Sequence, residues 1–360
     1  MRRTFLLGLL FAGCTTPKGN DPAIERLDKP AELGVVMNID LASEDRWKRN
    51  FKAADGWAKF VRISIGMESE GWDPDPKRCR YDRLRRLAKA CASKGMGMLV
   101  TIGGLPSAVA GPAWSKLGLT YKYEGKKYAE MPSGWSRAYV RWQQTAVRNL
   151  IEAYGTNAKN RIRFICLNEP YGRGEDGVVD ALIDRLLFGL LNKEGTIRGC
   201  PVDFPTIWGN LAQVKGQLAW LESRTRRYPK TFGRLRDIPI NVYLPSARKT
   251  DSASELSDRL VAHGKLTVGW AKSLLPGHEV YFSEFGVSRV WDTHGDTGKA
   301  AEVLLMSLRR LVPFVSSIAT YQAADPTEED ERVAGFGLIN MAGAPTLDLA
   351  QLRRLSKENQ

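Results

Sequence analysis

The stretch YDRLRRLAKACASKGMGMLVTIGG, residues 81–104, joins the two patterns that decide the fold. Apolar residues recur between Leu84 and Cys91 at helical spacing, so residues 81–96 are predicted to form an amphipathic helix. Residues 97–104 form a short and mostly apolar run, which is typical of a buried strand. A helix that leads directly into a buried strand is the repeating unit of proteins in which helices cover a parallel sheet.

The same alternation continues along the chain. Eight segments have the character of buried strands, namely 33–40, 60–67, 97–104, 162–170, 204–210, 238–245, 279–288 and 316–324. Helix-like segments separate them, including 47–60 and 177–195, and residues 337–360 end in a closing helix. Alternation implies parallel strands joined by right-handed crossovers. Eight units therefore predict an α/β fold, a single-domain (β/α)8 TIM barrel over residues 33–360. A nucleotide-binding sheet of the P-loop type would need a GxxxxGK[ST] fingerprint, which does not occur, and the one GxGxxG match, at residues 172–177, is by itself a weak signal.

The first fourteen residues, MRRTFLLGLLFAGC, are predicted to be a signal peptide rather than part of the fold. Two arginines precede a short apolar stretch, and small residues precede Cys14. The end of this segment resembles the bacterial lipoprotein box, which implies lipidation of Cys14 and a membrane anchor. A plain secretory signal and an unprocessed cytoplasmic end are the alternatives. Residues 15–32 are expected to be a polar tether. The predicted location is exported, either membrane-anchored in the periplasm or at the cell surface, or secreted.

The chain of 360 residues carries a formal net charge of +13. Basic residues concentrate in segments 77–94 and 223–236. In the first, helical spacing of the apolar residues favours a solvated outer face over a dedicated anion site. Such a surface suits a place near anionic envelope polymers, or an acidic polysaccharide as substrate. Nucleic acid is not expected as a partner, because the sequence contains no recognised nucleic-acid motif.

Two predicted strands end in glutamates. The fourth ends in Asn168-Glu169-Pro170, and the seventh contains Ser283-Glu284-Phe285-Gly286. Active sites of (β/α)8 barrels lie at the carboxyl ends of the strands, so Glu169 and Glu284 are expected to face one mouth. Two facing carboxylates, one protonated and one ionised, are the machinery that splits a glycosidic bond.

These motifs resemble those of clan A glycoside hydrolases, the barrel superfamily that includes the family 5 cellulase-like enzymes. The matching segments are FVRI (60–63), CLNEP (166–170), YFSEFG (281–286) and FGLINMAGAP (336–345). The resemblance covers the whole predicted barrel and implies a retaining mechanism. Two segments depart from family 5, which commonly has a histidine in each. Residues 100–104 read VTIGG and residues 240–243 read INVY. The chain therefore resembles a divergent member.

The resemblance also implies a role for individual residues. Glu169 would be the acid/base and Glu284 the nucleophile. Asn168 would hydrogen-bond the sugar 2-hydroxyl, Arg62 would keep Glu284 ionised, and Tyr243 would hydrogen-bond Glu284. The structural alternatives are a salt bridge within the mouth for Arg62 and a core position for Tyr243.

Aromatic residues near strand ends are candidates for contact with sugar rings, because a flat apolar face with a polar edge suits a pyranose. Tyr321 lies in the predicted eighth strand, where clan members usually offer a Trp. Four of the ten tryptophans fall in loops or at strand ends, namely Trp72, Trp114, Trp208 and Trp291. Of these, Trp208 and Trp291 are placed in the predicted substrate site.

Neither a metal nor a cofactor is predicted. The three histidines, His263, His278 and His294, are scattered without ligand spacing. Cys79 and Cys91 bracket a helix-like segment and are expected either to pair or to remain buried thiols. No Gly-x-Ser-x-Gly elbow is present for a serine hydrolase.

The sequence thus predicts a retaining glycoside hydrolase that acts on O-glycosidic bonds of a polysaccharide or oligosaccharide. One alternative is a catalytically inactive barrel lipoprotein that binds glycan, because a fold does not determine a function. Another is a lyase or transglycosylase that uses the same carboxylates.

Overall fold

A computed structural model of the chain describes residues in twelve stretches, with gaps between them. They are 24–37, 44–66, 81–104, 122–123, 126–127, 135–168, 184, 186–245, 247–289, 292–321, 336–338 and 348–358. Cys14, Glu169, Trp72, Trp114 and Trp291 lie outside the described residues.

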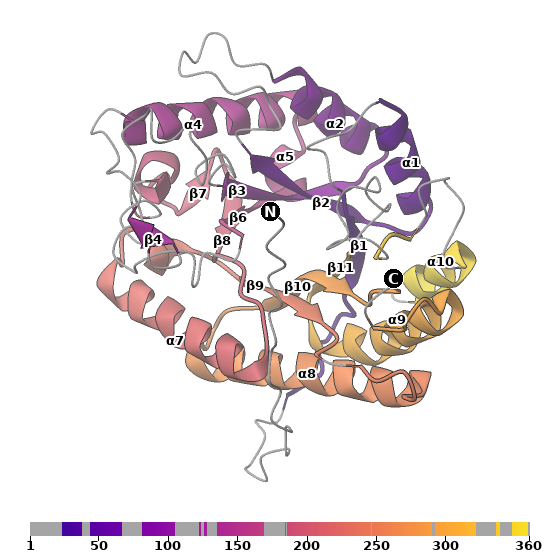
Figure 1. The fold of residues 1–360 in the computed structure, drawn as a ribbon. Coiled ribbons are helices and arrows are strands. Elements are labelled where there is room, and N and C mark those ends of the chain that lie inside the picture. The colour runs from indigo at the N-terminus through magenta and orange to yellow at the C-terminus, as the bar shows by residue number, and fades with distance from the viewer. Residues whose placement is uncertain are drawn as a thin grey trace.

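Eight parallel strands form a closed ring (Figure 1). They are β1 (Glu32–Val36), β2 (Phe60–Gly66), β3 (Gly97–Gly104), β6 (Ile162–Cys166), β8 (Cys200–Asp203), β9 (Ile238–Tyr243), β10 (Val280–Gly286) and β11 (Ser317–Thr320). β1 pairs in parallel with both β2 and β11, so the first and last strands are neighbours. An isolated parallel bridge between Ile207 and Ile240 joins the β8 side to β9. The predicted (β/α)8 barrel is therefore confirmed.

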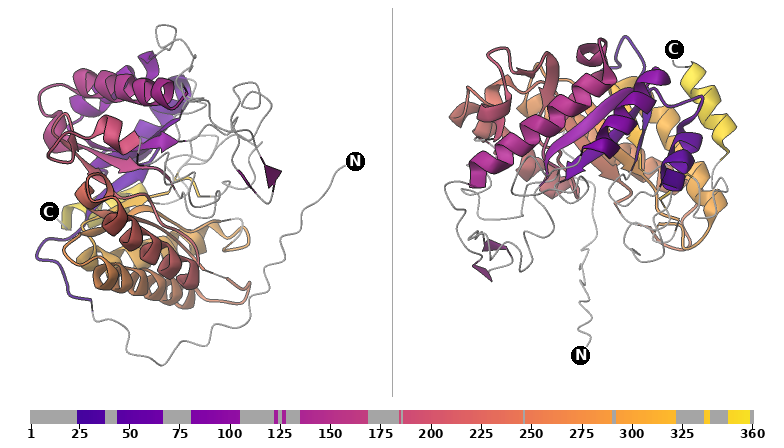
Figure 2. Two further views of the ribbon diagram at one scale, coloured as in Figure 1. Left: turned by 90° about the vertical axis from the view of Figure 1, so that its left-hand side faces the viewer. Right: turned by 90° about the horizontal axis from the view of Figure 1, so that it is seen from above.

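Helices surround this ring (Figures 1 and 2). They are α1 (Glu44–Ala54), α2 (Asp82–Ser93), α4 (Trp135–Tyr154), α5 (Ala158–Arg161), α7 (Leu211–Arg227), α8 (Ala253–Leu274), α9 (Thr297–Leu311) and α10 (Leu349–Glu358). Residues 186–190 are also helical, and Phe232–Arg234 and Val312–Phe314 form 3-10 turns. Capping boxes at Ser252 and Asn210 satisfy the first backbone N–H groups of α8 and α7 and define where these helices begin.

Two short ribbons complete the secondary structure. β7 (Thr196–Ile197) pairs antiparallel with β8, and β4 (Lys122–Tyr123) pairs antiparallel with β5 (Lys126–Lys127). In the part of the chain that the structure describes, no helix is long and apolar enough to cross a membrane.

Apolar side chains pack on both sides of the barrel wall. Successive residues of a strand face opposite sides, and here the outward set packs against the helices in the larger core. The inward set is a smaller cluster of Val36, Phe60, Leu99, Ile165, Tyr281 and Ala319. The barrel is consequently filled by side chains below its mouth, as expected for eight strands.

The predicted fifth strand, residues 204–210, is wrong in its boundaries. The regular strand is β8, which begins at Cys200 after the β7–β8 hairpin, and Ile207 makes only the isolated bridge. Pro205 has no N–H to give to a ladder, and Gly209 has a φ of 107°, so this segment cannot continue as a regular strand. The chain still follows the barrel wall here, because Asn241 donates its backbone N–H to Ile207 at 2.8 Å.

Three cysteines among the described residues, Cys91, Cys166 and Cys200, are buried free thiols. Burial raises the pKa of Cys91 to about 12 and that of Cys200 to about 11, so both stay protonated at neutral pH. Of the two alternatives for Cys91, the structure therefore has the buried thiol and not the pair with Cys79.

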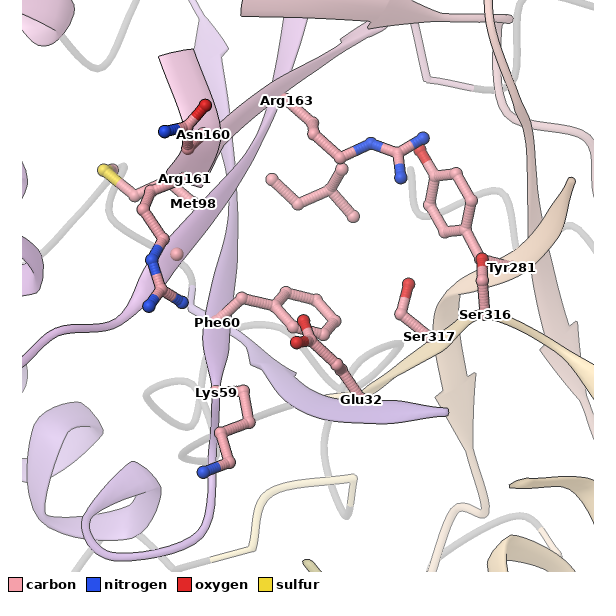
Figure 3. Close-up of a pocket in the computed structure, with 12 residues that line it drawn as sticks. Glu32, Lys59, Phe60, Met98, Asn160, Arg161, Arg163, Tyr281, Ser316 and Ser317 are labelled. Atoms are coloured by element: carbon pink, nitrogen blue, oxygen red, sulfur yellow. The ribbon is translucent and has the colours of Figure 1, made fainter. Parts of the chain in front are cut away.

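Charged residues close the amino-terminal end of the barrel. Arg163 donates to both Asp203 and Asp237, and the Tyr281 hydroxyl donates to Asp203 at 2.8 Å. Burial alone would lower the pKa of Arg163, but the attraction of Asp203 and Asp237 raises it, so the guanidinium is charged. A pocket of about 170 Å³ opens beside Arg163 and Tyr281 at this end (Figure 3).

Candidate active site

Glu284 lies on β10 at the opposite end of the barrel and is 6% exposed. The register of β10 against β9 shifts between Phe282 and Glu284, which marks a bulge. Phe282 and Phe285 both lie in the outer core and stack at 5.9 Å, although residues three apart in a regular strand face opposite sides. The bulge thus lets Ser283 and Glu284 form polar contacts inside the barrel while both phenylalanines pack outside.

Arg62 connects the side chains of two other strand ends. This residue of β2 is 2% exposed. Its Nη1 donates to Oε1 of Glu284, and its Nη2 donates to Oδ1 of Asn168 at 2.7 Å. One guanidinium therefore holds a carboxylate from β10 and an amide that follows β6 in a single cluster. Its planar fork of donors suits this double contact better than a lysine ammonium would.

Tyr243, the last residue of β9, donates its hydroxyl to Oε2 of Glu284. Both carboxylate oxygens of Glu284 therefore accept a hydrogen bond, one from a cation and one from a phenol. The Tyr243 ring packs edge-on against Tyr321 at 5.8 Å and against Phe336 at 5.6 Å. Tyr321 is held in turn by its backbone N–H, which donates to Phe285 at 2.8 Å. These three rings form an aromatic wall beside Glu284.

Asn168 directs its oxygen toward a set of donors. Its Oδ1 accepts from Arg62, from the Thr206 hydroxyl at 2.8 Å and from the Asn241 amide at 3.4 Å. Ser283 donates to Asn241 at 2.7 Å and thereby orients that amide. Because Oδ1 of Asn168 is engaged in this way, its NH2 group is the part of the amide that remains to bind a ligand acceptor.

Leu167 sets the direction of Asn168. It has a φ of 72°, which is uncommon for a residue with a Cβ, and it is 5% exposed. Its backbone N–H donates to Ile102 at 2.7 Å, and its carbonyl accepts from Thr206 at 3.1 Å. The left-handed residue ends β6 and turns the chain, and the two backbone bonds maintain this conformation. Strained residues of this kind cluster at functional sites.

The structure brings together five of the residues predicted from sequence, namely Arg62, Asn168, Tyr243, Glu284 and Tyr321. Trp208 has its backbone bonded to the Gln217 side chain at 3.1 Å and 2.6 Å, and the residue is 39% exposed. Glu169, the residue after Asn168, and Trp291 lie outside the described residues.

Sequence reasoning missed Thr206, Asn241, Ser283 and Leu167. Asn241 and Ser283 stand within the quoted segments of the sixth and seventh strands, so their polarity inside apolar runs was a usable signal. Thr206 and Leu167 gave none, because a threonine and a leucine within predicted strands are ordinary.

Two further titratable groups lie near the site. His263 of α8 is buried, its Nδ1 lies 3.2 Å from the Tyr243 carbonyl, and burial lowers its pKa, so it is neutral. Asp292 follows β10 and accepts the Ser288 N–H at 2.7 Å, and burial raises its pKa to about 6. Among the described residues, no group of three His, Cys, Asp or Glu side chains could hold a metal ion.

Comparison by sequence finds no relatives. No protein-family model matches the chain, and no curated protein is significantly similar to it.

Comparison by structure finds barrels of glycoside hydrolases. A family 39 glycoside hydrolase from Bacteroides cellulosilyticus WH2 is similar with a TM-score of 0.55 and 12% identity over 93% of this chain. The chain spans 64% of that protein's length. Thermotoga maritima Cel5A, solved with mannotriose, has a TM-score of 0.56 and 12% identity, with 89% of this chain and 96% of that one covered.

A third similar structure is a mutant of Rhizomucor miehei β-1,3-glucanosyltransferase in complex with laminaritriose. Its TM-score is 0.54 and its identity 13%, with 88% of this chain and 97% of that one covered. The structural neighbours are thus clan A enzymes, as the motifs indicated, and the chain shares their fold. At these identities the likeness concerns the fold alone.

Proposed function

We propose that the protein is a retaining glycoside hydrolase that cleaves O-glycosidic bonds of an oligosaccharide or polysaccharide. The observation that carries this proposal is the state of Glu284. It is a buried carboxylate at the mouth of a barrel shared with glycoside hydrolases, with Arg62 and Tyr243 on its two oxygens. A carboxylate that accepts hydrogen bonds from a cation and a phenol is held in a fixed orientation, as a nucleophile must be.

The reaction proceeds in two displacements. In the first, an oxygen of Glu284 attacks the anomeric carbon and forms a glycosyl ester, while the glycosidic C–O bond breaks. Glu169 gives its proton to the departing oxygen. In the second, Glu169 takes a proton from water, the water oxygen attacks the same carbon, and the ester bond to Glu284 breaks. Two inversions at one carbon give net retention.

The neighbouring side chains support these steps. The NH2 group of Asn168 donates to the sugar 2-hydroxyl, because the Asn168 oxygen is occupied by Arg62, Thr206 and Asn241. Such a hydrogen bond strengthens in the transition state. Tyr321, within the aromatic wall, forms one side of the sugar subsite. Trp208 is exposed and provides an outer stacking surface, since aromatic faces suit pyranose rings. Trp291 is assigned the same role from its place in the sequence alone.

The test begins with the purified protein on a panel of neutral and acidic polysaccharides and aryl glycosides. On the best substrate, Glu284→Ala removes the nucleophile and is expected to abolish turnover. Added azide then occupies the vacated space and yields a glycosyl azide of inverted configuration. Full activity of Glu284→Ala would contradict the assignment. The control is Glu279→Ala, an exposed glutamate that directly precedes β10 at the other end of the barrel, which should retain activity.

Transfer to a second sugar is the alternative that a specific observation favours, since one structural neighbour is a glucanosyltransferase. In that case the second displacement uses a sugar hydroxyl in place of water. Analysis of products at high substrate concentration separates the two outcomes, because transfer produces oligosaccharides longer than the substrate. Glycan binding that survives loss of both glutamates, with no turnover by the native protein, would indicate the catalytically inactive alternative.

We also propose that the protein is exported and anchored to a membrane through lipid on Cys14. The support is the sequence of the first fourteen residues. Labelling of the native protein and of Cys14→Ser with a radioactive fatty acid tests this, and equal labelling of both would contradict it.

A further inference from the structure

Charge is distributed unequally between the two ends of the barrel. Eight segments precede the barrel strands, namely 24–31, 55–59, 94–96, 155–161, 191–199, 228–237, 275–279 and 312–316. They contain 11 basic and six acidic residues, a net charge of +5. Helices that end near them add basic residues in their last turns, at Lys52, Arg224, Arg226, Arg227, Lys272, Arg309 and Arg310.

The segments that follow the barrel strands have the opposite sign. They are 37–43, 67–81, 105–134, 167–183, 204–210, 244–252, 287–296 and 321–348. By sequence they contain 12 basic and 20 acidic residues, a net charge of −8. The excess positive charge of the chain is therefore not on the connections next to the candidate active site. It does not by itself favour an acidic substrate there.

Five cations define the basic end face, a term used here for Lys59, Lys159, Arg161, Lys193 and Arg236. Four of them are exposed and Lys59 is half-buried. Each lies in a segment that precedes a barrel strand, so all five lie at the amino-terminal end. Lys59 and Arg161 stand on the rim of the pocket shown in Figure 3, where Glu32 is the acidic side chain.

These five cations have no structural ion-pair partner within the described part of the chain. Other surface cations do, such as Lys94 with Asp55 and Arg198 with Glu152. Cations in the last turns of helices have a structural explanation, because they complement the helix dipole. Lys159 and Arg161 lie in the last turn of the short helix α5, whereas Lys59, Lys193 and Arg236 lie outside the helices. With no ion pair in the described part of the chain, the charge of the basic end face is available to an external partner.

The chain's own amino-terminal segment passes over this end. Leu27 donates its backbone N–H to Pro313 at 2.8 Å, and Ala31 donates to Val312 at 3.0 Å. Ile24 is thus near the basic end face, and Cys14 is ten residues before it. Ten residues reach at most about 35 Å. A lipid on Cys14 would hold the amino-terminal end of the barrel close to a bilayer.

We infer that the basic end face binds the headgroups of an anionic phospholipid bilayer and turns the candidate active site away from the membrane. Basic residues near an anionic bilayer contribute about 1 kcal/mol each, and a few such contacts orient a tethered domain. This inference does not depend on the proposed glycosidase activity.

The test measures co-sedimentation of the full chain with vesicles of phosphatidylcholine alone and with added phosphatidylglycerol. Lipid on Cys14 or the apolar signal segment contributes to binding of both vesicle types. The difference in binding between the two vesicle types therefore reports the basic end face. We expect binding to be stronger with phosphatidylglycerol and to weaken in high salt. The ratio of binding with phosphatidylglycerol to binding without it should fall at least about tenfold in a quadruple variant. That variant carries Lys159→Glu, Arg161→Glu, Lys193→Glu and Arg236→Glu.

The matched control makes four equal reversals on exposed residues of the outer flank, Arg83→Glu and Lys89→Glu on α2 and Arg141→Glu and Arg148→Glu on α4. Both variants change the net charge equally, so a difference in their vesicle binding reports the position of the charges and not their number. Thermal unfolding checks that both variants fold. If the end-face variant does not fold, the same four positions are changed to Gln in place of Glu.

Three results would overturn the inference. They are equal binding to both vesicle types, an equal loss in the control variant, or retention by a soluble acidic polymer without preference for phosphatidylglycerol. Activity on a soluble substrate, measured in parallel, is expected to be the same in the native and end-face variants. A failure of vesicle binding is thereby distinguished from a failure of the proposed catalysis.

Discussion

Arg62 and Glu284 form a buried ion pair across the mouth of the barrel, although 222 residues separate them in the chain. Their side chains are 3% and 9% exposed. Desolvation of two charges is costly unless further hydrogen bonds complete the site. Here Asn168 and Tyr243 provide those bonds. Burial of the pair is therefore weak evidence for a stabilising role, and it is consistent with the role proposed for Glu284.

Arg62→Met is expected to destabilise the protein by roughly 3–5 kcal/mol, because it leaves the Glu284 carboxylate buried without its cation. The double variant Arg62→Met, Glu284→Gln should lose less unfolding free energy than the two single variants lose together, since neither buried charge then remains. Urea unfolding of the four proteins measures the coupling. Arg310→Met, which breaks an exposed pair with Asp258, is the control and should cost less than about 1 kcal/mol. Additive effects of Arg62 and Glu284 would contradict a direct interaction.

Tyr243→Phe removes only the hydroxyl that donates to Glu284. Because the ring still packs against Tyr321 and Phe336, the unfolding free energy should change by about 1 kcal/mol or less. Activity should fall by roughly a hundredfold, mainly in kcat, since one donor to the reacting carboxylate is lost. Steady-state kinetics on the best substrate of the panel measures this. An unchanged kcat would show that the hydroxyl has no part in the reaction.

Thr206→Val tests the orientation of Asn168, because it removes one of the three donors to the Asn168 oxygen at nearly constant volume. We expect kcat to fall about tenfold with little change in the fold. The matched control is Thr267→Val in α8, whose buried hydroxyl bonds the His263 carbonyl at 2.8 Å. A loss of stability in both variants with a loss of kcat in neither would assign Thr206 a purely structural role.

Tyr281→Phe acts at the opposite end of the barrel. It removes the donor to Asp203 in the network that Arg163 closes, so the unfolding free energy should fall by roughly 1–2 kcal/mol. The kcat and KM of the folded protein should not change, because the arrangement of side chains at the barrel mouth does not depend on this hydroxyl. A selective loss of kcat, at unchanged stability, would contradict the division of the barrel into a stabilising end and a reactive end.

Asp292→Asn is expected to stabilise the protein above pH 6 and to have little effect near pH 4. Burial raises the folded pKa of Asp292 to about 6, above the unfolded value, so the folded state favours the protonated form. The resulting stability is fully present below the unfolded pKa and is lost as pH rises through about 6. Asparagine keeps an oxygen for the Ser288 N–H without the charge. The gain in alkaline solution should be roughly 1–3 kcal/mol.

Thermal unfolding of the native protein and Asp292→Asn between pH 4 and pH 8 checks this dependence. The difference in Tm should grow as pH increases. A difference that is constant over the range, or largest in acid, would show that Asp292 is not the titrating group.

Local patterns were sufficient for most of the fold and part of the site. Residues 81–104 are a helix and a strand as predicted, because helical spacing and apolar runs are properties of neighbours in sequence. The fifth strand was misplaced, because the ends of β8 depend on its partners β6 and β7 and on the backbone at Pro205 and Gly209.

By itself, the sequence determined the alternation of strands and helices, and hence that Glu284 and Asn168 would stand at strand ends on one side of a barrel. Only the tertiary structure decided that Arg62 joins them, that Thr206 and Asn241 direct the amide of Asn168, and that a bulge turns Glu284 inward. The physical reason is that periodicity arises between neighbours along the chain, whereas strand register and hydrogen-bond partners are set between residues far apart in it.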